Sequence, residues 1–475
     1  MVNKRLLILS AAVLCTVGLL SVCTNDVQEE KPSPPPPLPL PIGPDLSYLL
    51  IEGNKVLNEN GEEVLLQGIN AGGYLVTERW MCAIASGGVV DHKPTTDLFT
   101  EKFGKAKTLQ IWDHYRKTFW TEDDFRNCED MGMNVIRLPF SYMSVDPVYN
   151  HVPEIPGEKY NFTILDNFIE RAKTHKMYTI LDMHGAYGSQ NGQDHSGQSI
   201  AVPSGGNNQQ YVTFYSATDP DAIENRRKTT ELWEAIAERY KDNPNVAGYD
   251  LLNEPGEKGT STQRRHWDYF DELYKAIRAV DPDHIIIIES CWAGSDLPHP
   301  VNSTYNWENN VMYSFHHYTH SDGVSSMPEA QRLQGHKDSM LRRVNEVAGR
   351  NFGIPIYMGE FTCLYGEEGW TYMLDLLQER GWHWTTWTYK VNQTSATATS
   401  PWGIYNSRLR RVVEDDVVVT DELVVTGTDS FETIIQKWSR IGTKDRSITP
   451  YTFPSGKTLY DLMKEYCTRD LTATN

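Results

Sequence analysis

The sequence predicts an α/β fold of the (β/α)8 TIM-barrel class, on two observations. From about residue 51, short apolar runs rich in β-branched residues alternate with longer stretches of helical periodicity, which is typical of a parallel sheet. About eight such runs can be counted, and eight strands that each lead into a helix close most naturally into a barrel. The chain of 475 residues has room for one large domain of this kind and a short appendage.

The expected strands and helices alternate along the chain. Strands are predicted at residues 65–70, 134–139, 178–184, 246–254, 284–289, 311–318, 354–360 and 382–389. Helices are predicted at residues 122–131, 164–175, 223–240, 263–280, 328–348 and 370–380. The first of these helices begins well, because Thr121 supplies a capping hydroxyl and three acidic residues fill the first turn.

Two β-hairpins are predicted outside this alternation. Residues 50–64 are expected to form an N-terminal hairpin with its turn at 58–61, which either covers the barrel floor or stays at an edge. Valine-rich runs at 417–420 and 423–426 predict an inserted hairpin with its turn at Asp421 and Glu422, before the last helix at 430–441. The alternative for this segment is a small appended β-domain.

The N-terminal segment predicts export. Lys4 and Arg5 precede an apolar run that ends at Cys23, so residues 1–23 resemble a signal peptide of the bacterial lipoprotein type; a simple secretory signal or a membrane anchor are the alternatives. Residues 24–47 form a proline-rich linker, a semi-rigid spacer ahead of the barrel domain at 48–475. We expect a secreted or cell-surface, outer-membrane protein that is a monomer and meets the membrane only through a lipid on Cys23.

Charge and motifs argue against several classes of partner. A net charge of −19 would repel a phosphate backbone, so nucleic acid is not an expected partner. The sequence has no HExxH motif, no CxxC pair and no glycine-rich phosphate loop. We therefore expect no metal and no other cofactor, although several histidines lie near the predicted strand ends.

Polar side chains stand at the ends of several predicted strands. In a parallel barrel the active site lies at the carboxyl ends of the strands. Polar groups are costly in a core unless they have partners, so their convergence on one rim predicts a polar pocket. The residues at these positions are Arg137, His184, Asn253, Glu254, His316, Tyr318, Glu360 and Trp387.

Glu254 and Glu360 are the candidates for catalysis, since they end strands four and seven, which face each other across the barrel mouth. Retaining glycoside hydrolysis needs one carboxylate to attack the anomeric carbon and another to protonate the leaving oxygen, about 5 to 5.5 Å away. Arg137 and Tyr318 could keep the nucleophile ionised, while a drier setting and the neighbouring negative charge would keep the acid protonated. Asn253 would donate to the sugar 2-hydroxyl.

The sequence motifs around these residues resemble those of glycoside hydrolase family 5, whose members are retaining β-glycosidases on (β/α)8 barrels. The resemblance runs from about residue 50 to 405 and rests on Asn-Glu-Pro at 253–255 and Gly-Glu-Phe at 359–361. It implies that Glu254 is the general acid/base and Glu360 the nucleophile. It also implies a pocket completed by Arg137, His184, Asn253, His316, Tyr318 and Trp387.

Residues 68–81 and 184–194 are similar to the fungal exo-β-1,3-glucanase branch of that family. This similarity implies that Glu78 and Asp194 help to bind a terminal glucose. The branch carries an aromatic clamp where this chain has Gln193 and, nearby, Ser321. The expected function is a retaining β-glycosidase acting on β-glucan, with exo-β-1,3 cleavage as the finer prediction. The alternatives are an endo-β-1,4-glucanase or mannanase, and a catalytically inactive surface glycan-binding protein.

Overall fold

The computed structural model describes residues 46–84, 91–200, 212–256, 260–290, 293–392, 401–407, 411–414, 417–420, 423–443 and 448–468. The expected signal at 1–23, the lipid anchor at Cys23 and almost all of the linker at 24–47 lie outside these residues, so they stay predictions. Within the described part of the chain, no helix is long and apolar enough to cross a membrane.

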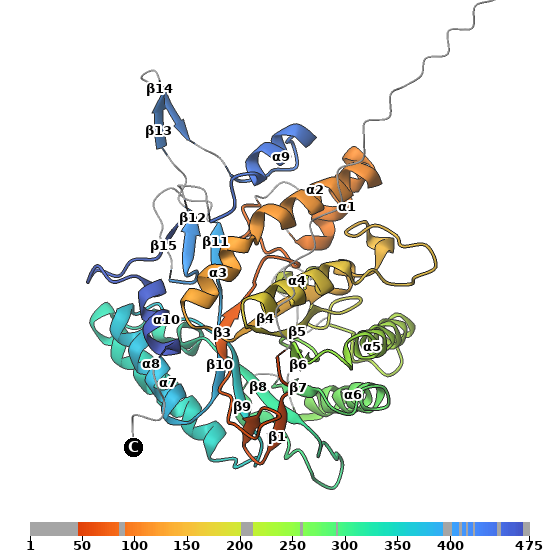
Figure 1. Ribbon diagram of the computed structural model, residues 1–475, viewed down its shortest axis with the longest axis vertical. Coiled ribbons are helices and arrows are strands. Elements are labelled where there is room, and N and C mark those ends of the chain that lie inside the picture. Colours follow the sequence, from red (N-terminus) through yellow and green to blue (C-terminus); the bar gives the residue numbers. More distant parts are fainter. Residues whose placement is uncertain are drawn as a thin grey trace, which may run out of the picture. The chain divides into compact units, whose positions relative to one another are not determined.

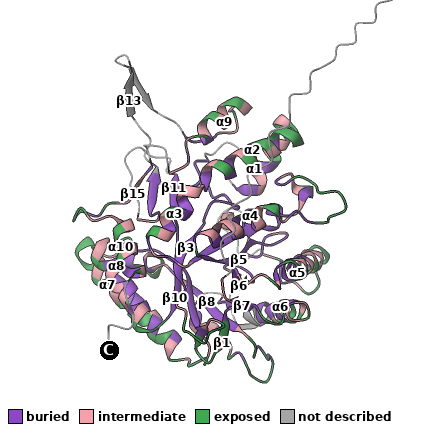
Figure 2. Cartoon of the chain, viewed as in Figure 1, coloured by how far each residue is buried: buried purple, intermediate pink, exposed green. Residues whose placement is uncertain are grey.

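The predicted barrel is confirmed (Figure 1). Eight parallel strands pair in the order β10-β3-β4-β5-β6-β7-β8-β9, and β10 closes the ring by pairing with both β3 and β9. The strands are β3 (Gln67–Asn70), β4 (Val135–Ser141), β5 (Tyr178–Gly185), β6 (Val246–Asp250), β7 (Ile285–Glu289), β8 (Val311–His317), β9 (Ile356–Phe361) and β10 (His383–Thr386). They are buried almost throughout (Figure 2), which explains why they read as continuous apolar runs.

Helices surround the barrel (Figure 1). Six confirm predicted ones: α3 (Glu122–Asp130), α4 (Thr163–Thr174), α5 (Pro220–Tyr240), α6 (Thr260–Arg278), α7 (Glu329–Ala348) and α8 (Gly366–Glu379). Two helices that the sequence did not predict, α1 (His92–Phe103) and α2 (Lys105–Phe119), precede α3. The expectation that every strand leads into a helix is wrong after β7, where the described residues form only the single turn Gly294–Asp296.

The N-terminal hairpin covers the barrel floor. Strands β1 (Leu50–Glu52) and β2 (Lys55–Leu57) pair antiparallel, and the buried Val56 packs in one apolar cluster with residues such as Leu66 and Tyr178 at the barrel bottom. The predicted turn at 58–61 exists but follows β2, whereas the hairpin turn itself lies between β1 and β2. Burial of Val56 against the strand beginnings favours the floor position over an edge.

The C-terminal part combines the inserted hairpin with a small sheet that the sequence did not predict. Strands β11 (Lys390–Asn392), β12 (Tyr405–Ser407) and β15 (Ile448–Pro450) form this small sheet. The inserted hairpin is confirmed as β13 (Arg411–Glu414) with β14 (Val417–Thr420), so the prediction of a strand at 423–426 after a turn at 421–422 is wrong. The predicted last helix is α9 (Phe431–Trp438), and a further helix, α10 (Leu459–Cys467), follows it.

Candidate active site

The carboxyl ends of the barrel strands surround a cavity of about 390 Å³. Seven of the residues predicted for the site line it directly. Arg137 and His316 lie behind the wall and bond to its carboxylates, whereas Asp194 does not line the cavity. The lining residues are Glu78, Trp80, His184, His195, Asn253, Glu254, Tyr318, Glu360, Trp387 and Trp402.

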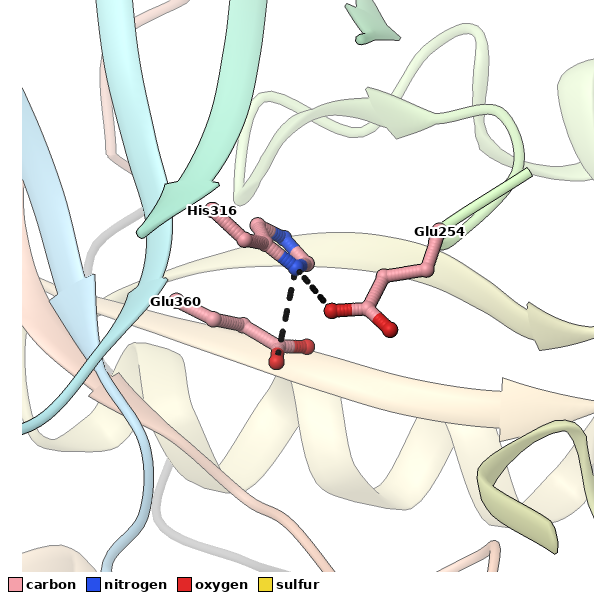
Figure 3. A group of neighbouring side chains, drawn as sticks. All are labelled: Glu254, His316 and Glu360. Carbon is pink, nitrogen blue, oxygen red and sulfur yellow. Dashed lines mark hydrogen bonds and ion pairs between the residues drawn. The ribbon is translucent and has the colours of Figure 1, made fainter. Parts of the chain in front are cut away.

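Glu254 and Glu360 point toward each other across this cavity (Figure 3). One carboxylate oxygen of Glu254 and one of Glu360 lie within 4.8 Å of each other. The His316 ring lies beside both carboxyl groups, with its Nδ1 3.0 Å from Glu254 Oε1 and 3.5 Å from Glu360 Oε2. This spacing suits two carboxyl groups that act on the same anomeric carbon with retention.

The Glu360 carboxylate accepts one hydrogen bond on each oxygen. Arg137 Nη1 donates to Oε1 at 2.8 Å, and the Tyr318 hydroxyl donates to Oε2 at 2.7 Å. Burial lowers the pKa of Arg137, but Asp182, Asp250 and Glu360 together raise that pKa well above its ordinary value. A permanent cation and a hydroxyl donor favour the ionised, nucleophilic form of Glu360.

Asn253 is oriented by the same arginine. Arg137 Nη2 donates to Asn253 Oδ1 at 3.0 Å, and the backbone N–H of Asn253 donates to the carbonyl of Met183 at 3.1 Å. Because its carbonyl oxygen accepts from Arg137, Asn253 can donate to a bound sugar only through Nδ2, which also lies 3.5 Å from His184 Nε2. The residue lines the cavity, as a donor to a 2-hydroxyl must.

His184 and Trp387 form a stacked pair on one wall. Their ring centroids are 5.3 Å apart and their planes differ by 4°. Burial lowers the pKa of His184 to about 3, so the ring is neutral. Asp182 Oδ2 lies 2.7 Å from His184 Nδ1 and fixes the hydrogen on that nitrogen. The flat faces of this pair give the cavity a rigid apolar side.

Glu254 has a strained backbone that its neighbours hold in place. Its φ is +39°, in the left-handed region that residues other than glycine seldom adopt. The backbone N–H donates to Glu289 Oε1 at 3.0 Å, and the backbone carbonyl accepts from Asn191 Nδ2 at 2.9 Å. Such strain persists where surrounding contacts over-determine it, which is common at functional sites.

The electrostatic setting of Glu254 differs from the expected one. Burial raises the pKa of its carboxyl, as expected, but His195 and His316, when both are charged, outweigh burial and lower that pKa. Burial lowers the pKa of His316, but the negative charges of Glu289, Glu360 and Glu254 outweigh burial and raise that pKa to about 10. A cationic imidazole therefore stands beside the candidate acid, where the sequence predicted only a dry and negative environment.

Glu78 lines the same cavity beside the aromatic rings of Trp80 and Trp402. Trp80 Nε1 donates to Glu78 Oε2 at 2.8 Å, and the Trp80 ring is 5.3 Å from that of Trp402. Burial raises the pKa of Glu78 well above its ordinary value, and the negative charge of Asp194 raises it further. The Asp194 side chain is 49% exposed. Its neighbour His195, which sequence reasoning missed, reaches the cavity instead; the only signal was a second titratable residue beside Asp194.

A second hollow of about 200 Å³ adjoins the first on the side of Glu254. The two cavities share His195, Glu254 and Tyr318, but Glu360 lines only the first. Gln193 and Ser321, which stand at the positions of the aromatic clamp, both line this hollow, and no tryptophan or phenylalanine is among its described lining residues. Its other lining residues are Asn191, Gly256, Glu289, Ser290, His316, His317, Asp322 and Arg343.

Glu254, His316 and Glu360 are also the described side chains whose ligand atoms lie close enough together to hold a metal ion. Glu360 already accepts from Arg137 and Tyr318, and Glu254 contacts His316. The carboxylates thus have protein partners that balance their charge without an ion.

A closed parallel barrel with two facing carboxylates at its mouth, one of them held by an arginine and a tyrosine, is the architecture of a retaining glycoside hydrolase. Residues 97–393 match the family described as Cellulase (glycosyl hydrolase family 5). The chain belongs to this family, and the resemblance predicted from its sequence is confirmed.

Relatives of the chain differ in their names. A β-xylosidase of Phanerodontia chrysosporium is 28% identical over 365 residues, which cover 73% of this chain and 71% of that protein. A probable glucan 1,3-β-glucosidase A of Aspergillus clavatus is 26% identical over 308 residues. That match covers 64% of this chain and just under two thirds, 66%, of the glucosidase.

Solved structures share the fold. A rutinosidase from Aspergillus niger superposes with a TM-score of 0.53 at 15% identity, covering 71% of this chain and 93% of that one. An endogalactoceramidase gives a TM-score of 0.53 at 17% identity, covering 89% of this chain and 85% of that one.

Proposed function

We propose that this enzyme cleaves β-glucan by double displacement, with Glu360 as nucleophile and Glu254 as general acid/base, and that it removes glucose from the ends of β-1,3-linked chains. The observation that carries the proposal is the pair of facing carboxylates whose oxygens lie within 4.8 Å, one of them held by Arg137 and Tyr318. Glu360 can then reach the anomeric carbon while Glu254 reaches the glycosidic oxygen bound to it.

In the first step a Glu360 oxygen attacks the anomeric carbon and the glycosidic C–O bond breaks, while Glu254 gives its proton to the leaving oxygen. In the second step a water attacks the same carbon, Glu254 takes its proton, and Glu360 departs as a carboxylate. Arg137 and Tyr318 donate to that carboxylate and stabilise it as it is released. Asn253 holds the 2-hydroxyl as charge develops in the ring.

Two features support a glucan substrate. The cavity that contains both carboxylates is walled by Trp80, Trp387 and Trp402, whose faces can stack on a sugar ring. The second hollow meets only the acid, so it is placed for the leaving group. Its polar side chains suit the hydroxyls of another sugar better than a flat aromatic or a lipid group.

A terminal xylose is the second candidate for the sugar that is released, because the chain is 28% identical to a protein named as a β-xylosidase. Xylose lacks the hydroxymethyl group of glucose. Phenyl β-glucoside and phenyl β-xyloside share one leaving group, so the ratio of their kcat/KM values reports the preferred sugar alone.

Products from laminari-, cello- and manno-oligosaccharides test the proposal. We expect glucose from the chain ends of laminari-oligosaccharides, formed first as the β-anomer by NMR. Mixed oligosaccharides would identify an endo-acting enzyme, and an α-anomer would overturn double displacement. Glu360→Gln should reduce kcat by at least about 10⁴-fold while oligosaccharide binding persists. Binding without turnover in the unmutated protein would identify a glycan-binding protein instead.

We also propose that the protein is exported and tethered by a lipid on Cys23. The basic residues, the apolar run and the cysteine that ends it support this. Labelled palmitate should enter the unmutated protein but not Cys23→Ser, and the variant should appear in the medium. A retained, unlabelled protein would point to a membrane anchor.

A further inference from the structure

The loop after β5 brings an imidazole against the proposed acid. His195 belongs to the single turn Asp194–Ser196, and its Nε2 lies 3.3 Å from Glu254 Oε2. The protonation of this imidazole decides its effect on Glu254. A cation would favour the carboxylate, whereas a neutral ring with its lone pair on Nε2 would favour the carboxylic acid.

Asn191 reveals which nitrogen of His195 carries the hydrogen. Asn191 Oδ1 accepts from the backbone N–H of Gln193 at 2.9 Å, and Asn191 Nδ2 donates to the backbone carbonyl of Glu254 at 2.9 Å. A reversed amide would place donor against donor in the first contact and acceptor against acceptor in the second. The two bonds therefore fix the orientation of the amide.

The same Asn191 Nδ2 lies 2.7 Å from His195 Nε2. An N–H group at this distance needs an acceptor, so Nε2 carries no hydrogen. The hydrogen of His195 is then on Nδ1, which lies 4.0 Å from the Asp194 carboxylate. A cationic ring would set two N–H groups against each other, so the hydrogen-bond network requires neutral His195.

We propose that neutral His195 is a positioning residue that keeps the proton on Glu254 Oε2 until a glycosidic oxygen arrives to take it. Oε2, at 3.3 Å, shares the single lone pair of Nε2 with Asn191 Nδ2, so this oxygen is stabilised as O–H and repelled as a carboxylate oxygen. The other oxygen, Oε1, faces His316 Nδ1 at 3.0 Å and can accept. One accepting and one donating oxygen describe a protonated carboxyl. The proposal rests on the role of Glu254 as general acid.

Other titratable and charged groups lie around Glu254 and His195, and every one of them remains when His195 alone is replaced. A change in the titration of Glu254 then reports what His195 contributes. These groups are Glu78 after β3, Arg137 on β4, Asp182 and His184 on β5, Asp194 beside His195, Glu289 on β7, His316 on β8 with Tyr318 after it, and Glu360 on β9.

The pH dependence of kcat/KM on phenyl β-glucoside tests the proposal, because its upper limb reports the acid in the free enzyme. We expect His195→Ala to move this limb to lower pH by about half to one unit, the effect of one lost hydrogen bond. His195→Gln, whose amide oxygen can replace the acceptor, should keep the limb near that of the unmutated enzyme. The loss in kcat/KM should be smaller on 2,4-dinitrophenyl β-glucoside, whose leaving group needs no proton.

The direction of the shift decides the outcome. If His195 is cationic, both replacements remove a positive charge and move the limb to higher pH, which overturns the proposal. An unmoved limb in a folded His195→Ala variant also overturns it.

The activity of Glu254→Ala on the dinitrophenyl substrate distinguishes a failure of the proposed function from a failure of the role of His195. If azide does not restore its activity, the proposed function is wrong at Glu254. If azide restores activity and the His195→Ala limb does not fall, only the role of His195 is wrong.

Discussion

Arg137 and Glu360 share a 2.8 Å hydrogen bond in the interior of the barrel mouth, where the arginine is fully buried and the glutamate is 4% exposed. The same guanidinium lies 3.1 Å from Asp182 and 2.8 Å from Asp250. One cation therefore contacts three carboxyl groups and also orients the proposed nucleophile. Stability and catalysis depend on the same side chain at this position.

Replacing Arg137 by methionine should destabilise the fold. The substitution leaves Asp182, Asp250 and Glu360 buried without their cation, so we expect the free energy of unfolding to fall by about 3 to 5 kcal/mol in urea at neutral pH. Arg342→Met is the control, because Arg342 is exposed and its ion pair with Asp322 contributes about 1 kcal/mol or less. An Arg137→Met protein as stable as the control would contradict this account.

Removing the Tyr318 hydroxyl should slow catalysis with little effect on folding. Tyr318→Phe removes one of the two donors to Glu360 but keeps the ring, which packs 5.2 Å from Trp402. We expect kcat to fall about 10²-fold, as for loss of one preorganised donor. Tyr365→Phe is the matched control, since its hydroxyl has no hydrogen-bond partner in the described part of the chain. Equal kcat values for the two variants would remove Tyr318 from the mechanism.

Much of the barrel could be predicted because its strands are buried on both faces and read as apolar runs. Helices α1 and α2 were not predicted, because their buried faces include polar side chains such as His92, Thr95 and Arg116, which weaken the apolar stripe. Strand β11 pairs with β12, which in turn pairs with β15 more than forty residues on, and each has three residues. Pairing at such distance leaves no local periodicity to read.

The site was predictable where its residues end strands. Glu254 and Glu360 follow apolar runs, so strand order alone placed them across the mouth. Asp250 could not be predicted, because the strand expected at 246–254 places it inside an apolar run, whereas β6 ends at Asp250, and its role emerges only from the hydrogen bond that it accepts from Arg137. Loop geometry decided that His195, and not Asp194, lines the cavity. No sequence rule gives the direction of a side chain on a single turn.

Lys390 should behave as half of a buried ion pair. Its Nζ lies 3.7 Å from Asp124 Oδ2 and 4.7 Å from the Phe119 ring centroid, linking β11 to α3. Lys390→Met removes the cation beside the buried Asp124, which keeps its hydrogen bonds from Thr121 and Thr443, so we expect the free energy of unfolding to fall by about 3 kcal/mol. Adding Asp124→Asn removes the negative charge and should recover part of the loss. Strictly additive effects in the double-mutant cycle would show that the two groups do not interact.

His383 at the start of β10 should make the fold sensitive to acid. Burial lowers the pKa of His383 to about 4, and its Nδ1 accepts a hydrogen bond from the backbone N–H of Leu66 at 3.0 Å. Between about pH 6.5 and pH 4 the unfolded chain binds a proton that the folded protein refuses. The contribution of this histidine to stability therefore falls as the pH falls through that window, by about 1.4 kcal/mol per pH unit.

His383→Asn offers an amide oxygen to the backbone N–H of Leu66 and cannot titrate. We expect its unfolding free energy to fall about 2 to 3 kcal/mol less than that of the unmutated protein between pH 7 and pH 4.5, measured in urea. His299→Asn, at an exposed position, should follow the unmutated protein; an unchanged pH dependence in His383→Asn would mean that this ring is protonated in the folded state.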